Sequence, residues 1–133
     1  MALIRKKLKQ PKIEWIERYV DNISTTDATP TDISIGLTIP PNSTVIVNLE
    51  WRCEQDDRTN TFAGSSSAQY AKVGAALATE LYGSPLSGSG SFPGPHPTAQ
   101  LSLTSDTVVM RITGKIATNI NWNAKIQYNI KYQ

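Results

Sequence analysis

The chain contains few side chains that could carry out catalysis, and none is placed for it. His96 is the single histidine and lies in a Pro-Gly-Pro-His-Pro run, without a second histidine or nearby cysteine for a metal site. Asp56 and Asp57 are adjacent on a polar stretch, whereas paired-carboxylate catalysis needs two acids facing each other across a substrate. No serine occupies a Gly-x-Ser-x-Gly motif, and no phosphate-binding glycine motif is present. We therefore predict no enzymatic activity, no cofactor and no metal.

The single cysteine, Cys53, excludes an internal disulfide framework. It falls in phase with the apolar residues of the segment before it, from Val45 to Trp51, so we predict a buried structural thiol. The alternating residues of this segment, including Glu50 and Arg52, would face water.

The aromatic residues divide into two groups. Trp51, Trp122, Tyr128 and Tyr132 are in phase with apolar positions of alternating segments, which predicts core packing. Tyr82 and Phe92 instead lie in or beside the Gly/Pro/Ser-rich stretch 83–97. There, aromatic rings can stack on a sugar or anchor in a partner protein, or they can fold back and pin the loop. Together with one imidazole they form a candidate loop contact surface: Tyr82, Phe92 and His96.

The N-terminus is a basic arm, residues 1–12, with five cations and no acid before Glu14. Such an arm indicates contact with an acidic surface, although a solvated tail has the same composition. Apolar residues among the cations favour docking on a protein. No aromatic residue lies within the arm to stack on bases, so we predict no specific nucleic-acid binding. The candidate docking residues are Leu3, Ile4, Arg5, Lys6, Lys7, Leu8, Lys9, Lys12 and Trp15.

Apolar and polar residues alternate along several segments of the chain, most clearly from Ile120 to Tyr132. This two-residue period is typical of a strand with one buried face. The period recurs at 33–39, 44–53, 68–78, 98–103 and 107–113. Residues 13–23 also fit a helical wheel, but their residue types and the β context favour a strand. We predict an all-β protein: an antiparallel jelly-roll-like β-sandwich of six to eight strands, formed by one domain, 13–133, after the arm.

The connections give further expectations. Pro40-Pro41-Asn42-Ser43 should end one strand and join it to the next as a hairpin. The polar residues 54–67 should form a mobile loop, and 83–97 a long irregular surface stretch of the kind that often binds partners. The longest apolar run is far below the roughly 20 residues that span a bilayer. The N-terminus lacks the apolar stretch of a signal peptide, so we expect neither a membrane protein nor secretion by that route.

Three stretches resemble a module of tailed-bacteriophage structural proteins. They are residues 24–31 (Ser-Thr-Thr-Asp-Ala-Thr-Pro-Thr), 39–45 (Ile-Pro-Pro-Asn-Ser-Thr-Val) and 118–126 (Thr-Asn-Ile-Asn-Trp-Asn-Ala-Lys-Ile), in the order expected for the module. The resemblance implies a small β-sandwich found in fibres, tail tips and capsid-decorating proteins. It also implies a location in the virion and a homo-oligomer, with a trimer favoured.

The resemblance and the basic arm together lead to two functional hypotheses. The first is a non-enzymatic virion protein that decorates or cements the capsid, or attaches to the head, and docks on major capsid or tail proteins through residues 1–12. The alternative is a receptor- or carbohydrate-binding module of a tail fibre or tail tip, with a host surface glycan as ligand.

Overall fold

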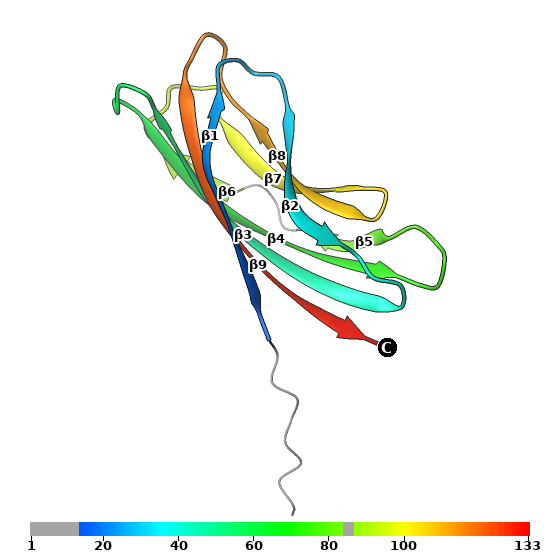
Figure 1. Ribbon diagram of the computed structural model, residues 1–133. Coiled ribbons are helices and arrows are strands. Elements are labelled where there is room, and N and C mark those ends of the chain that lie inside the picture. The colour runs from blue at the N-terminus through cyan, green and yellow to red at the C-terminus, as the bar shows by residue number, and fades with distance from the viewer. Residues whose placement is uncertain (1–13, 84–86) are drawn as a thin grey trace, which may run out of the picture.

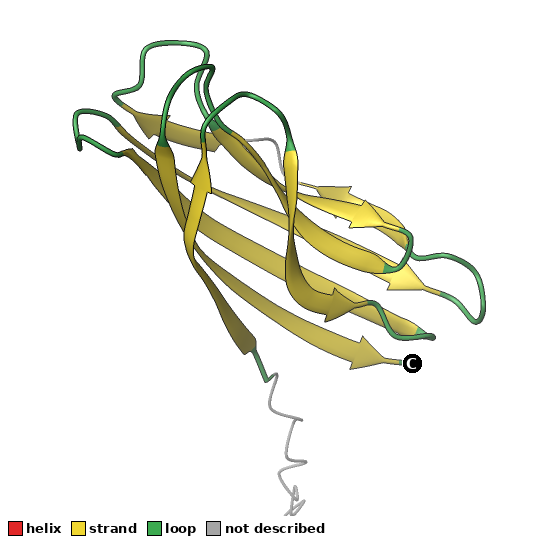
Figure 2. Cartoon of the chain, turned by 45° about the horizontal axis from the view of Figure 1, so that its top comes forward, coloured by secondary structure: helices red, strands yellow, loops and turns green. Residues whose placement is uncertain are grey.

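The computed structural model describes residues 14–83 and 87–133, which form two antiparallel sheets packed face to face (Figures 1 and 2). This confirms the predicted all-β sandwich, although the described residues form nine strands where six to eight were predicted. In the six-stranded sheet, β1 (Ile16–Thr25), β9 (Ile120–Tyr132), β3 (Ser43–Gln55) and β4 (Thr61–Lys72) follow one another, and β5 (Thr79–Gly83) and β6 (Ser87–Gly90) both pair with β4. The three-stranded sheet contains β2 (Thr31–Thr38), β8 (Thr107–Thr113) and β7 (Thr98–Thr104).

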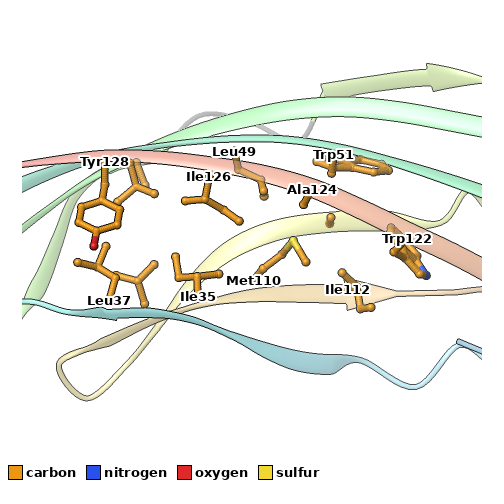
Figure 3. Close-up of a cluster of buried hydrophobic side chains, with 14 of the residues drawn as sticks. Ile35, Leu37, Leu49, Trp51, Met110, Ile112, Trp122, Ala124, Ile126 and Tyr128 are labelled. Carbon is orange, nitrogen blue, oxygen red and sulfur yellow. The ribbon is translucent and has the colours of Figure 1, made fainter. Parts of the chain in front are cut away.

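The core lies between the sheets and is built from alternating residues of each strand. Figure 3 shows side chains of β2 and β8 pointing toward those of β3 and β9. Fully burying one such aliphatic or aromatic side chain contributes about 1.5–3 kcal/mol. The sequence period therefore assigned the inward face correctly for most strands. The buried residues that this period placed on the inward face include Ile35, Leu37, Val45, Val47, Leu49, Trp51, Cys53, Val108, Met110, Ile112, Ile120, Trp122, Ala124, Ile126 and Tyr128.

Residues 16–25 form a strand, as residue type predicted and helical periodicity did not. β1 pairs antiparallel with β9, with Ile16 opposite Tyr128 and Thr25 opposite Ile120. The register shifts between Val20 and Ile23, where Asn22 has a positive φ of 59°. The backbone groups of β9 supply partners for β1 along its length, and this pairing outweighs the helical pattern.

The predicted hairpin at Pro40 and Pro41 is wrong. β2 pairs with β8 in the small sheet, whereas β3 pairs with β4 and β9 in the large one. The two prolines lack N–H donors and end the ladder, so the connection crosses from one sheet to the other. Ile39 N donates to Asp106 O over 2.7 Å, and Ser43 Oγ donates to Pro40 O over 2.7 Å, which fixes this crossing.

The predicted mobile loop at 54–67 is also wrong, because most of it is strand. β3 and β4 form a hairpin whose short turn is closed by Gln55 N donating to Asn60 O over 2.9 Å. Arg58 in this turn has a φ of 61°. β4 lies between β3 and the short strands β5 and β6, so backbone pairing on both sides compensates for its low intrinsic strand preference.

The stretch 83–97 is less irregular than predicted, since it contains β6. Gly90 pairs with Phe62, and Gly88 pairs with Gly64 on β4. A Cβ atom on Gly88 would overlap the Phe62 ring, and one on Gly90 would overlap the carbonyl oxygen of Thr61. The glycines are therefore required by a close strand approach, not by a flexible loop.

Two further expectations need correction. The strand predicted over 68–78 ends at Lys72, and Val73 to Ala78 form a turn in which Gly74 has a φ of 56°. Tyr132, predicted to be in the core, is 66% exposed because it lies at the end of the last strand.

A candidate ligand-binding face on the six-stranded sheet

The structure does not bring the predicted loop contact residues onto one surface. Phe92 is only 3% exposed and packs in the core, which matches the alternative that the ring folds back and pins the loop. His96 is exposed and stacks on Phe62, with 4.9 Å between ring centroids. Tyr82 is 57% exposed on β5. The contact surface expected from Tyr82, Phe92 and His96 is thus not formed as a set.

The docking arm, residues 1–12, lies outside the described residues. Of its candidate anchors only Trp15 is described, and it lies directly before β1 with 43% of its surface exposed. Its role in docking stays a prediction.

A row of neighbouring aromatic rings lies on the inner side of the large sheet. Trp122 and Trp51 have ring centroids 5.7 Å apart, and Trp51 and Phe62 are also 5.7 Å apart. The Trp122 indole N–H donates to Thr25 Oγ1 over 2.9 Å in a buried hydrogen bond. Aromatic pairs at such spacing stabilise the folded protein by about 0.5–1.5 kcal/mol beyond the effect of area burial. The packed rings therefore hold in place the strands that carry the residues of the opposite face.

That opposite face is polar, and the strand registers order it into rows. One row crosses four strands: Tyr19 on β1 is opposite Lys125 on β9, which is opposite Glu50 on β3, which is opposite Ser65 on β4. All four side chains point away from the core because their chain neighbours point into it. Directly opposed residues have Cβ atoms about 4.5–5.5 Å apart, so the row is continuous.

The next row toward the β3–β4 turn contains Asn123, Arg52 and Ala63, with Ser89 of β6 opposite Ala63. The irregularity in β1 places Asp21 beside this row. With its amide nitrogen turned toward β1, Asn123 donates to Asp21 Oδ1 over 3.2 Å. The bulge therefore contributes a carboxylate to the face that a regular strand would have spaced differently.

The two rows line a shallow hollow of about 910 Å³ on the outer face, which we call the trough. One end carries the exposed ring of Tyr19. The other end is floored by small residues of β4 and β6, where a ligand can approach the backbone closely. Its lining comprises Tyr19, Asp21, Glu50, Trp51, Arg52, Ala63, Gly64, Ser65, Gly88, Ser89, Asn123, Ala124 and Lys125.

A second hollow of about 460 Å³ adjoins the trough toward the β3–β4 turn. Both hollows are lined by Arg52, Asn123, Ala63 and Ser89, so these residues stand at the junction. Together the two hollows make a continuous polar path across the sheet.

The charged groups around the trough differ in how they are engaged. The pKa of Glu17 is lowered, first because Gln127 donates a hydrogen bond over 2.9 Å, and second because Lys125 lies 3.5 Å away. Glu54 pairs with Arg58 over 3.4 Å at the other end of the face. Among described residues, Arg52 and Glu50 make no ion pair, which leaves both groups open to a ligand.

The chemistry of the trough is suited to binding. Carboxylates accept hydrogen bonds from hydroxyl groups, while the guanidinium, ammonium and amide groups donate them. Beneath it, Cys53 is buried, and burial raises its pKa to about 12, so the thiol is not a nucleophile. No group of three or more metal-ligating side chains occurs in residues 14–83 and 87–133, and no helix there is long and apolar enough to cross a membrane.

Sequence reasoning identified Glu50 and Arg52 as wet-face residues but did not identify this site. The signal that joins them to Tyr19 and Lys125 is the pairing of β3 with β9 and of β9 with β1. Glu50 and its partner Lys125 are about 75 positions apart in the chain, and Tyr19 and Lys125 are about 105 positions apart.

Comparison with known proteins gives similarity to phage tailspikes. No protein-family model and no curated protein matches the chain. Among solved structures, it is similar to the Acinetobacter phage vB_ApiP_P1 tailspike protein, with a TM-score of 0.38 and 17% identity, over 99% of this chain and 24% of that one. It is also similar to the Acinetobacter baumannii phage AM24 tailspike protein, with a TM-score of 0.37 and 8% identity, over 88% and 26%.

The chain thus spans about a quarter of the length of these tailspike chains. At these TM-scores and identities the likeness establishes neither a common fold nor a common function.

Proposed function

We propose that this protein is a non-enzymatic attachment module of a tailed-phage virion, which binds a host surface glycan through the outer face of its six-stranded sheet. The observation that carries this proposal is the trough. It combines an exposed ring, Tyr19, with two carboxylates, two cations and an amide on one rigid sheet face.

A glycan fits this set of groups better than a protein does. Sugar hydroxyl groups both donate and accept, so they can satisfy Asp21 and Glu50 as well as Arg52 and Lys125. The apolar face of a sugar ring can stack on Tyr19, which is 63% exposed. The centre of a protein interface is normally depleted of charge, whereas the trough carries charged side chains of both signs.

The assignment to a virion rests on the sequence resemblance of residues 24–31, 39–45 and 118–126 to the phage structural module. The resemblance implies a homo-oligomer, and repeated copies would convert weak single-site binding into stable attachment. The capsid-decorating role depended on residues 1–12, which lie outside the described residues. We prefer the receptor-binding alternative, a module of a tail fibre or tail tip, because the trough lies on described strands of the sheet.

The absence of turnover is part of the proposal. The stacked position of His96 on Phe62 and the burial of Cys53 leave neither as a free nucleophile or base on the trough. The trough is open to solvent, whereas catalysis by acids and bases gains from groups held in a water-excluded site.

The test is binding of the labelled protein to a panel of encapsulated bacteria before and after periodate, which cleaves vicinal diols. We expect periodate-sensitive binding that is lost in Tyr19→Ala and Arg52→Ala. The matched controls are Tyr82→Ala, on the opposite edge of the sheet, and Arg18→Ala, whose side chain points to the other face of β1.

Both control variants should bind like the natural protein. Binding that survives periodate but not protease treatment of the cells contradicts the proposal, as does loss in Tyr82→Ala with Tyr19→Ala unaffected.

A further inference from the structure

We infer that the ligand of the trough is a neutral oligosaccharide segment that lies across the strands, not an acidic polysaccharide and not a single terminal sugar. This inference rests on the proposed function and names the chemical class of its ligand. Three features carry it: the charge pattern of the face, the length of the rows and the open floor at one end.

The charge pattern disfavours a polyanion. The trough itself holds two acids and two cations, Asp21 and Glu50 against Arg52 and Lys125. The two hollows taken together are lined by four acids and three cations: Asp21, Glu50, Glu54, Asp56, Arg52, Arg58 and Lys125.

Two of these cations are already engaged, because Lys125 lies 3.5 Å from Glu17 just outside the trough and Arg58 lies 3.4 Å from Glu54. A repeating carboxylate or phosphate would thus meet as much repulsion as attraction along the path. A neutral, hydroxyl-rich chain can hydrogen-bond to both signs without a charge penalty.

The acids keep free acceptor capacity. Glu50 forms no ion pair within the described residues, and Asp21 has the Asn123 amide at 3.2 Å on one oxygen. Neighbouring hydroxyl groups of one sugar can donate to the two oxygens of a carboxylate, which is geometry that a second anion cannot supply. The carboxylates on this face therefore select against acidic ligands as well as for hydroxyl groups.

The length of the rows indicates more than one sugar. From β1 to β4 the rows cross three strand spacings of about 4.8 Å, which is roughly 14 Å in all. This exceeds a single sugar ring. The second hollow extends the path further at Arg52 and Asn123.

The floor at the β6 end indicates that the chain continues beyond the trough. Among the described residues, the lining there is Ala63, Gly64, Ser65, Gly88 and Ser89, and none of these side chains is large enough to form a wall. A site for a terminal sugar would be closed by bulky side chains around its end. An open end instead accommodates an internal segment of a longer polymer.

The experiment measures affinity for neutral gluco-, galacto- and manno-oligosaccharides of one to six residues and for hyaluronan oligosaccharides of the same lengths, at 50 and 500 mM NaCl. We expect one neutral series to bind, with affinity rising at least tenfold from one residue to about three or four and then levelling. Binding should change less than twofold with salt, because no net charge is neutralised. Glu50→Gln should weaken it about tenfold, from loss of a charge-assisted hydrogen bond.

Tighter binding of hyaluronan that falls with salt and disappears in Arg52→Ala overturns the neutral class but keeps the trough as a glycan site. Equal affinity for one and for six residues overturns the segment. Binding of no oligosaccharide in either series also overturns the inference. The proposed function fails separately, if cell binding is insensitive to periodate and to Tyr19→Ala and Arg52→Ala.

Discussion

The two faces of β3 differ in burial: residues on one face pack in the core, and the residues that alternate with them face the trough. Trp51 is 5% exposed and lies between Trp122 and Phe62, while its neighbour Arg52 lines the trough without an ion pair in the described residues. The inward residue is fixed by packing on every side. The outward residue is exposed and forms no ion pair within the described residues, so its guanidinium can donate hydrogen bonds to a ligand.

The same contrast holds on β9, where Trp122 is buried and hydrogen-bonded to Thr25, and Asn123 and Lys125 line the trough. A stiff core beneath a polar face fixes the spacing of the polar groups. Binding groups placed on strands are held more precisely than groups on loops.

The largest expected effect separates two adjacent residues. Trp51→Ala removes two ring contacts and leaves a cavity, so we expect the free energy of unfolding to fall by about 3–5 kcal/mol. Arg52→Ala should change it by less than about 0.5 kcal/mol, because the guanidinium is exposed. Urea unfolding of both variants provides the measurement. Similar losses in the two variants would show that the faces are not energetically distinct.

A smaller effect is expected where the trough floor meets the core. Gly90→Ala would push a methyl group against the Thr61 carbonyl and the Phe62 backbone, which should destabilise the protein by roughly 1–3 kcal/mol. Gly94→Ala is a matched control, since a Cβ there meets nothing within 4 Å. Thermal unfolding compares the two. An unchanged stability of Gly90→Ala would mean that β6 can move away from β4 without cost.

The smallest effect concerns a polar pair that serves the fold instead of the face. Lys72 donates to Asp106 Oδ2, and Ala78 N donates to Asp106 Oδ1 over 2.8 Å, linking β4 to the β7–β8 turn. The hydrogen bond from Lys72 is the main reason that the pKa of Asp106 lies below its usual value. A carboxylate with a lowered folded pKa stabilises above its unfolded pKa, near 3.9, and loses this contribution as pH falls below it.

The melting temperature of Asp106→Asn should therefore lie below that of the natural protein at neutral pH, and the gap should narrow below about pH 4. Other carboxylates with lowered pKa values, such as Asp32 beside Arg111, titrate equally in both proteins and cancel in the comparison. A difference in melting temperature that stays constant down to about pH 2 would show that the Lys72–Asp106 ion pair does not stabilise the protein.

Many of the strands could be predicted from the sequence, because the alternation of apolar and polar residues is visible within a single segment of the chain. The inward residues of Thr107–Thr113 were predicted correctly, and so were those of Ile120–Tyr132 apart from the exposed Tyr132. The failures fall where backbone pairing outweighs residue type. The serine-rich residues of β4 are a strand because β3 pairs with them, and Gly88 and Gly90 belong to β6 because Phe62 occupies the space of their missing side chains.

From the residues alone, the inward side chains of most predicted strands and the burial of Cys53 could be assigned. Only the tertiary structure decided that the Pro40-Pro41 connection changes sheets, that Phe92 is buried, and that Tyr19, Lys125, Glu50 and Arg52 share one face. The physical reason is that the face of a side chain follows from the two-residue period of its own strand. The neighbours of that side chain follow from strand order and register, which depend on pairing between distant segments.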